Sequence, residues 1–188
     1  MANNVGNILT INCQDPDIME RIKKLILGND KNNNKEFSME ILLPRSKVFA
    51  DEEHYDLDWN NSIWGTKWDV YDVSIIESGS TTILCYNTAW CPNSGWIESL
   101  CGYLNHYISR SPKKDTCKLE VEHRYSDYPG NFGGIVNWKP GIKFEYKHYN
   151  SYMEYLKNHN SEAYEEMLEI EERLKSGNNA VGRISIPI

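Results

Sequence analysis

The sequence predicts an α+β fold in which an antiparallel sheet carries two helices on one face. Two segments repeat apolar residues at helical spacing, and four others have the apolar–polar alternation or apolar composition typical of strands. Their order along the chain is strand, helix, strand, strand, helix, strand. This is the order of the split βαβ arrangement, the ferredoxin-like plait, and we expect a further hairpin and a long C-terminal helix after it.

The first strand and helix are predicted from alternation followed by a helix start signal. Residues 7–13 alternate along a strand, with their apolar side chains on one face. Asp15 then suits the N-cap of a helix and Pro16 its first position. We expect this helix to end at Gly28. The apolar side chains of its buried stripe are Ile18, Ile22, Leu25 and Ile26.

Three less regular segments follow the first helix. Residues 29–35 form a polar, Asn-rich loop, and residues 37–43 form a short apolar stretch that is either extended or a loop packed on the core. Residues 51–58 carry five acidic side chains and no Lys or Arg. We expect an exposed acidic loop there, with contact to a basic partner as the alternative.

A hairpin, a second helix and a fourth strand complete the predicted plait. Residues 70–76 and 81–87 are the strands on either side of a Ser-Gly-Ser turn. Ser94 is the expected N-cap of the helix, and residues 118–124 alternate as a half-buried strand. The apolar stripe of this second helix consists of Ile97, Leu100, Cys101, Leu104 and Ile108.

The rest of the chain is expected to extend the same domain. Residues 134–138 and 142–148 predict a hairpin, and residues 152–175 predict a helix with an acidic face and a possible break near His159. Residues 176–188 alternate isoleucines and can pair as an edge strand within this chain or with a partner chain. We therefore expect one domain, with the plait and hairpin in residues 1–150 and the acidic helix and tail in residues 151–188, packed on them or appended.

Composition excludes several classes of function. The chain has 20 basic and 27 acidic residues and a net charge of −7, which argues against a nucleic-acid partner. It has no long apolar run and no signal-peptide pattern, so we expect a cytoplasmic protein with no membrane contact. Five unevenly spaced cysteines predict free thiols, and neither Cys nor His shows metal-ligand spacing. We expect no cofactor and no metal.

Three motifs stand out from this background. Residues 64–69 read Trp-Gly-Thr-Lys-Trp-Asp, residues 88–90 read Thr-Ala-Trp shortly before a proline, and residues 123–127 read His-Arg-Tyr-Ser-Asp ahead of a glycine-rich stretch. In this order they resemble the YubB-like proteins of phages, plasmids and other mobile elements, most clearly over residues 37–134. The resemblance implies a ferredoxin-like domain and brings no established function. Cys91 and Asn93 depart from the family pattern, in which Ser and a second Pro are more common.

The motif residues have a structural and a functional interpretation. In the first, Trp64, Trp68 and Trp90 form one aromatic mini-core, and Lys67 pairs with a neighbouring aspartate or lies over an indole. In the second, the polar residues of the motifs surround one pocket that holds a phosphate or carboxylate, stacks a base and moves a proton. The polar residues of that pocket are Lys67, Asp69, His123, Arg124, Tyr125 and Asp127.

These observations favour a non-catalytic, protein-binding accessory protein of a mobile element. Its most concrete form is an inhibitor of a host defence complex such as a CRISPR effector. Its acidic side chains, including those of residues 51–58 and Glu165, Glu166 and Glu169, would bind a partner protein with a basic surface. The alternatives are a small-molecule or nucleotide enzyme that uses the predicted pocket, and a single-stranded nucleic-acid binder that uses the sheet.

Overall fold

The computed structural model describes residues 4–29, 34–45, 53–114, 116–127, 132–150 and 152–162, together with positions 164, 165 and 168. Its elements in chain order are β1 (Asn4–Cys13), α1 (Pro16–Ile26), β2 (Leu27–Asn29), β3 (Lys35–Phe37), α2 (Met39–Leu42), α3 (Glu53–Ile63), β4 (Tyr71–Ser78), β5 (Thr81–Ala89), α4 (Ser94–Ser109), β6 (Leu119–Asp127), β7 (Gly133–Trp138), β8 (Glu145–Tyr149) and α5 (Tyr152–His159).

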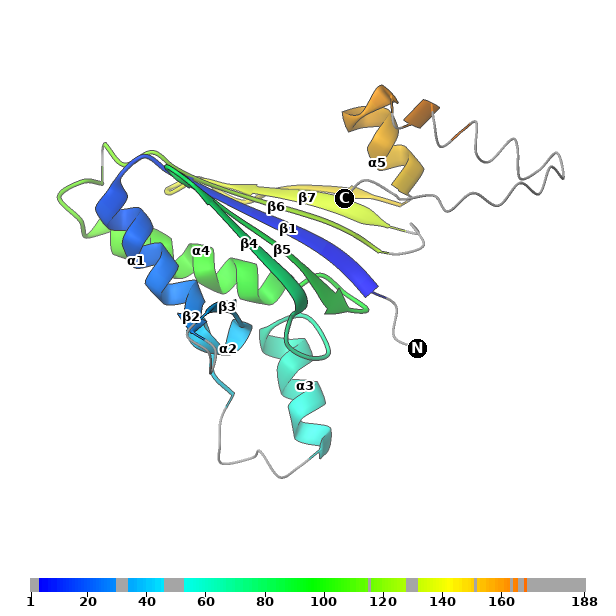
Figure 1. The fold of residues 1–188 in the computed structure, drawn as a ribbon, viewed down its shortest axis with the longest axis horizontal. Helices are drawn as coiled ribbons and strands as arrows, with labels where there is room; N and C mark the ends of the chain where they lie inside the picture. The colour runs from blue at the N-terminus through cyan, green and yellow to red at the C-terminus, as the bar shows by residue number, and fades with distance from the viewer. Residues whose placement is uncertain are drawn as a thin grey trace, which may run out of the picture.

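Six of the strands form one antiparallel sheet, in the order β4–β5–β1–β6–β7–β8 (Figure 1). The predicted α+β class and the two predicted hairpins, β4–β5 and β7–β8, are confirmed. The strand order differs from that of a bare four-stranded plait because β7 and β8 continue the sheet beyond β6. The short strands β2 and β3 pair only with each other.

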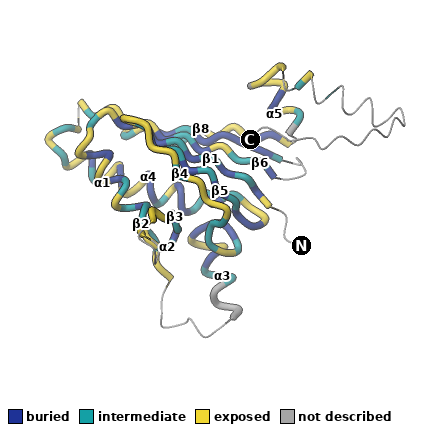
Figure 2. The backbone as a smooth tube through the Cα atoms, in the orientation of Figure 1, coloured by how far each residue is buried: buried dark blue, intermediate teal, exposed yellow. Residues whose placement is uncertain are grey.

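Helices α1 and α4 cover one face of the sheet, and the core lies between them and the strands (Figures 1 and 2). The apolar stripes predicted for both helices point into this core, apart from Leu25, which is only partly buried against it. Leu9 of β1 illustrates the pairing register of the central strands. It lies opposite Leu84 of β5 on one side and His123 of β6 on the other, on the face that the helices cover. Within the described ranges, no helix has the length and apolar character needed to cross a membrane.

The two helix starts were predicted closely. The carboxylate of Asp15 accepts hydrogen bonds from the amides of Asp17 and Ile18 at 3.0 and 3.1 Å, which is the expected N-cap. Helix α4 begins at Ser94, so Asn93 rather than Ser94 is its N-cap. The prediction that Gly28 ends α1 is wrong, because the chain becomes extended at Leu27 and continues as β2.

The two segments between α1 and β4 differ from their predicted form. Residues 53–63 form helix α3 rather than an acidic loop, and the end of this helix is held by the buried Asn60 and by Trp59, which packs against the core. Asp58 is exposed, as predicted for the acidic side chains. The apolar stretch at 37–43 supplies the end of β3 and the single turn of α2.

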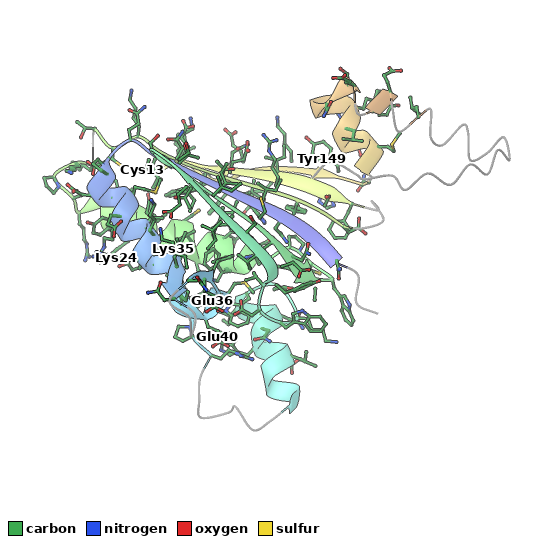
Figure 3. The ribbon with its side chains drawn as sticks, viewed as in Figure 1. Cys13, Lys24, Lys35, Glu36, Glu40 and Tyr149 are labelled. Carbon is green, nitrogen blue, oxygen red and sulfur yellow. The ribbon has the colours of Figure 1, made fainter. Side chains whose placement is uncertain are left out.

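Helix α5 lies against β7 and β8 on the face opposite α1 and α4 (Figure 1). Leu156 of α5 is buried, and so is Tyr149 at the end of β8, beside which the helix begins (Figure 3). The helix ends at His159 and Asn160 is not helical, which agrees with the predicted break. Residues 171–188, including the predicted tail, lie outside the described residues, and the division of the domain at residue 150 stays a prediction.

Candidate functional site

Trp64, the first residue of the Trp-Gly-Thr-Lys-Trp-Asp motif, belongs to the core. It is completely buried, and its indole N–H donates to the carbonyl of Leu43 at 3.1 Å. The ring of Trp59 meets it edge-on, with 5.3 Å between ring centroids. A buried indole with a satisfied N–H stabilises the fold and offers nothing to a ligand.

The next two residues attach the motif to the sheet and to α4. Gly65 has a φ of +83°, and a Cβ there would lie 3.1 Å from the backbone nitrogen of Gly95, so only glycine fits this turn. Thr66 is completely buried, and its hydroxyl donates to the carbonyl of Ala89 at 2.9 Å and accepts from the amide of Ala89 at 3.1 Å. The motif is therefore bonded to the end of β5.

Lys67, Trp68 and Trp90 meet at the surface, and we call these three residues the indole patch. The ammonium of Lys67 lies 4.4 Å from the ring centroid of Trp90 and 5.2 Å from that of Trp68. Trp68 is 39% exposed and Trp90 54% exposed. The predicted single mini-core of three tryptophans is thus wrong. One indole is internal, and the other two enclose a lysine at the surface.

The backbone at Trp90 is strained, with a φ of +70°. A large residue in this region costs on the order of 1–3 kcal/mol and persists only where surrounding contacts hold it. Those contacts are the Thr66–Ala89 bonds on one side and, on the other, the hydroxyl of Thr88, which donates to the Cys91 carbonyl at 2.8 Å. Two cation–π contacts at an exposed site contribute roughly 0.5–1 kcal/mol each and at most offset the strain.

Asp69 does not join this patch. Its carboxylate accepts hydrogen bonds from the amides of Met39 and Val70, each at 2.8 Å, and from the hydroxyl of Ser38. It therefore caps the first turn of α2. Of the two predicted arrangements of Lys67, the cation–π contact over an indole is confirmed. The pairing with a neighbouring aspartate, Asp69 or Asp72, is not seen, and Asp72 accepts from Asn87 at 3.1 Å.

His123 lies in a buried polar network on the covered face of the sheet. Its Nε2 is 2.9 Å from Oδ1 of Asn7, whose amide nitrogen donates to the Val5 carbonyl at 2.8 Å and to Thr88 Oγ1 at 2.9 Å. These two donations leave the Asn7 oxygen as acceptor, so the His123 proton is on Nε2. Burial lowers the pKa of His123 to about 3, and the ring stays neutral at physiological pH.

Two consequences follow from this network. Nδ1 of His123 has no hydrogen-bond partner among the described residues, and the side chain is completely buried. The chain of bonds from His123 through Asn7 and Thr88 ends on the Cys91 carbonyl, next to Trp90. The network therefore connects a buried, neutral imidazole to the residue that follows Trp90.

The remaining residues of the predicted pocket lie apart from one another. Arg124 faces the opposite side of the sheet from His123 and bonds Glu122 at 2.8 Å. The hydroxyl of Tyr125 lies 3.3 Å from Nδ1 of His148. Asp127 accepts from the amide of Phe132 at 2.9 Å and so closes the β6–β7 connection. The structure thus divides the six polar residues among several places.

Of the three predicted acidic contacts on the last helix, Glu165 is exposed, and Glu166 and Glu169 lie outside the described residues. Sequence reasoning missed Asn7 and Thr88, the two polar residues that link His123 to the patch. A signal for Asn7 was available, because it occupies an inward position of β1 between the buried Val5 and Leu9.

Two surface grooves have linings that contain none of the predicted pocket residues. The larger one measures about 680 Å³ and runs between β3 and the edge strand β4, past Lys35 and Glu36 (Figure 3). No cluster of three metal-ligating side chains exists among the described residues.

No family model matches the sequence, and no curated protein matches it.

Proposed function

We propose that the chain is a non-catalytic protein-binding module that contacts its partner through the indole patch of Lys67, Trp68 and Trp90. The observation that supports this most is the exposure of two indoles, Trp68 at 39% and Trp90 at 54%, the second between residues bonded to buried threonines on both sides. Tryptophan is among the residues most enriched at the energetic centres of protein interfaces.

The energetics of the patch favour an occupied surface. Since a tryptophan side chain has about 250 Å² of surface, the two exposed fractions amount to roughly 200 Å² that a partner can cover. At about 25 cal/mol per Å², covering it contributes on the order of 5 kcal/mol before the costs of association. Because hydrogen bonds on both sides already hold the backbone at Trp90, little backbone freedom is lost there on binding.

The proposed partner is a protein with a basic surface. The net charge of −7 and the exposed carboxylates of Asp58 and Glu165 support this choice, since complementary charge accelerates encounter and selects partners. The ammonium of Lys67 does not oppose it, because it faces the two rings. The specific form of the proposal is an accessory protein of a mobile element that inhibits a host defence complex, such as a CRISPR effector, in the host cytoplasm.

We further infer that the scaffold of this module is a ferredoxin-like plait made of β4, β5, β1 and β6 with α1 and α4. The position of β1 between β5 and β6, and the position of both helices on one face, support this assignment. In this interpretation β7, β8 and α5 are additions at the β6 edge.

The test compares the purified protein with two variants as bait in host-cell extract, followed by identification of co-purifying proteins. The double variant Trp68→Ala, Trp90→Ala should lose a partner that the native protein retains. The control Ile142→Ala removes a similarly exposed apolar side chain, 55% exposed, on the β7–β8 turn and should keep the partner. Equal recovery by the patch variant and the control, with all three proteins folded, would show that the indoles are not the contact.

A further inference from the structure

A second groove, of about 560 Å³, lies over the C-terminal half of α4. Its lining consists of Tyr103, His106, Tyr107, Arg110, Ser111 and Pro112. This volume is within the range of sites for small molecules. The groove is separate from the indole patch, because the Trp64 motif packs on Gly95 in the first turn of α4, and about 12 Å of helix lies between Gly95 and Tyr103, the first lining residue.

Arg21 of α1 is held at this groove by two of its tyrosines. Its Nη2 donates to the hydroxyl of Tyr103 at 3.1 Å, and its guanidinium carbon lies 4.6 Å from the ring centroid of Tyr107. Arg110 is exposed at the end of α4 and lines the same groove. The structure therefore holds the guanidinium group of Arg21 against two tyrosines of a groove that Arg110, at the end of α4, also lines.

The charge of these arginines is not neutralised within the described part of the chain, where neither Arg21 nor Arg110 makes an ion pair with a carboxylate. The nearby lysines behave differently. Lys113 pairs with Asp15 at 2.7 Å and with Asp17 at 2.9 Å, and Lys24 pairs with Glu20 at 3.5 Å. In a chain with a net charge of −7, this groove concentrates uncompensated positive charge.

Interaction with the helix dipole explains the positions of His106 and Arg110 but not the position of Arg21. Cations in the last turn of a helix stabilise it, which suits His106 and Arg110 at the end of α4. The effect falls off within one turn and does not apply to Arg21, which lies in the middle of α1. The contacts of Arg21 with two tyrosines are therefore a feature of the groove itself.

We propose that this groove binds a nucleoside phosphate. The two guanidinium groups bind the phosphate oxygens, for which their planar donor arrangement is suited. The ring of Tyr103, 37% exposed, stacks on the base, as aromatic side chains do in nucleotide sites, while the ring of Tyr107 holds Arg21 against its face. The imidazole N–H of the exposed His106 supplies a further donor to the phosphate or sugar.

The test is calorimetric titration of the purified protein with four probes, namely inorganic phosphate, adenosine, AMP and a single-stranded oligoadenylate. AMP should bind with a dissociation constant below about 1 mM and about tenfold more tightly than phosphate or adenosine, because it alone carries both groups. Its affinity should fall as salt is raised. If oligoadenylate binds no more tightly per nucleotide than AMP, the groove is a site for the free nucleotide. If affinity rises strongly with oligonucleotide length, the proposal is overturned in favour of a site for single-stranded nucleic acid.

Matched variants connect the binding to the groove. Arg21→Gln and Arg110→Gln should each weaken AMP binding by about tenfold, the contribution of one charged hydrogen bond. Lys24→Gln, an exposed cation on the same helix as Arg21 (Figure 3), should leave it unchanged. Tyr103→Phe removes the hydroxyl that holds Arg21 but keeps the ring, so Tyr103→Ala should weaken AMP binding more than Tyr103→Phe does. No binding of AMP at about 5 mM, equal binding of phosphate and AMP, or full binding by the two arginine variants overturns the proposal.

Discussion

Replacing Thr66 by valine removes one buried hydroxyl and retains the shape of the side chain. That hydroxyl is bonded twice to Ala89, as donor at 2.9 Å and as acceptor at 3.1 Å. The Ala89 carbonyl keeps a bond from the amide of Cys91 at 2.9 Å, but the Ala89 N–H loses its acceptor. A buried unsatisfied donor costs about 1–3 kcal/mol and the second lost bond about 1 kcal/mol, so we expect a loss of roughly 2–4 kcal/mol.

The measurement is guanidinium denaturation followed by tryptophan fluorescence, with thermal unfolding as a second readout. In a chain of this size the expected loss lowers Tm by about 5–15 °C. Thr66→Ser keeps the hydroxyl and should lose only about 1 kcal/mol for one buried methyl group. Thr116→Val, at an exposed position, should change stability by less than about 0.5 kcal/mol.

The two Thr66 variants also separate the possible explanations. If valine is tolerated within about 0.5 kcal/mol, the hydroxyl does not hold the loop, and the account of the strained Trp90 backbone fails. If serine destabilises as much as valine, methyl packing rather than hydrogen bonding is responsible. If the reasoning holds, Thr66→Val also weakens partner binding, because Trp90 loses its fixed position.

Three further predictions concern other parts of the sheet. Gly134→Ala should destabilise the protein by about 1–3 kcal/mol in denaturant titrations, because its Cβ would lie 2.5 Å from Cζ of Tyr125; Gly102→Ala, with nothing within 4 Å, should instead stabilise α4 by roughly 0.5–1 kcal/mol. His123 has a folded pKa of about 3 and an ordinary value of 6.5, so the unfolded chain binds the proton first as pH falls. The native protein should therefore lose about 2 kcal/mol between pH 7 and pH 5 from this group, and a His123→Leu variant with the same pH slope would contradict this. Asp69→Ala should cost about 1–2 kcal/mol through loss of the α2 cap, and equal melting temperatures would show that the cap is dispensable.

The periodic elements could be predicted from the sequence because their signals are local. Alternation and apolar composition predicted β1, β6 and the hairpin strands. The apolar stripe predicted α4, whose buried residues are those expected together with Trp96, which was not in the predicted stripe. Helix α2 could not be found in this way. It has a single turn, and its capping carboxylate, Asp69, comes thirty residues later in the sequence than the first amide it binds, that of Met39.

The motif residues were harder to interpret because neighbours in sequence have different roles. Trp64 and Thr66 point into the protein, Lys67 and Trp68 meet at its surface, and Asp69 turns to another helix. The residue types and their order in the motif do not indicate which of these side chains point inward and which lie at the surface. The separation of Arg124 from His123 was predictable, since successive residues of a strand face opposite sides of the sheet.

The position of β1 inside the sheet has a consequence for how the protein forms during translation. β1 leaves the ribosome well before its neighbours β5 and β6, which begin only at Thr81 and Leu119. At ~5–20 residues per second, the strand waits roughly 5–20 s before both sides are paired. Nascent chains that stop before β6 expose the apolar face and one backbone edge of β1, which makes them substrates for chaperones and prone to aggregation. Ribosome profiling with stalled chains would locate the folding step at the emergence of β6.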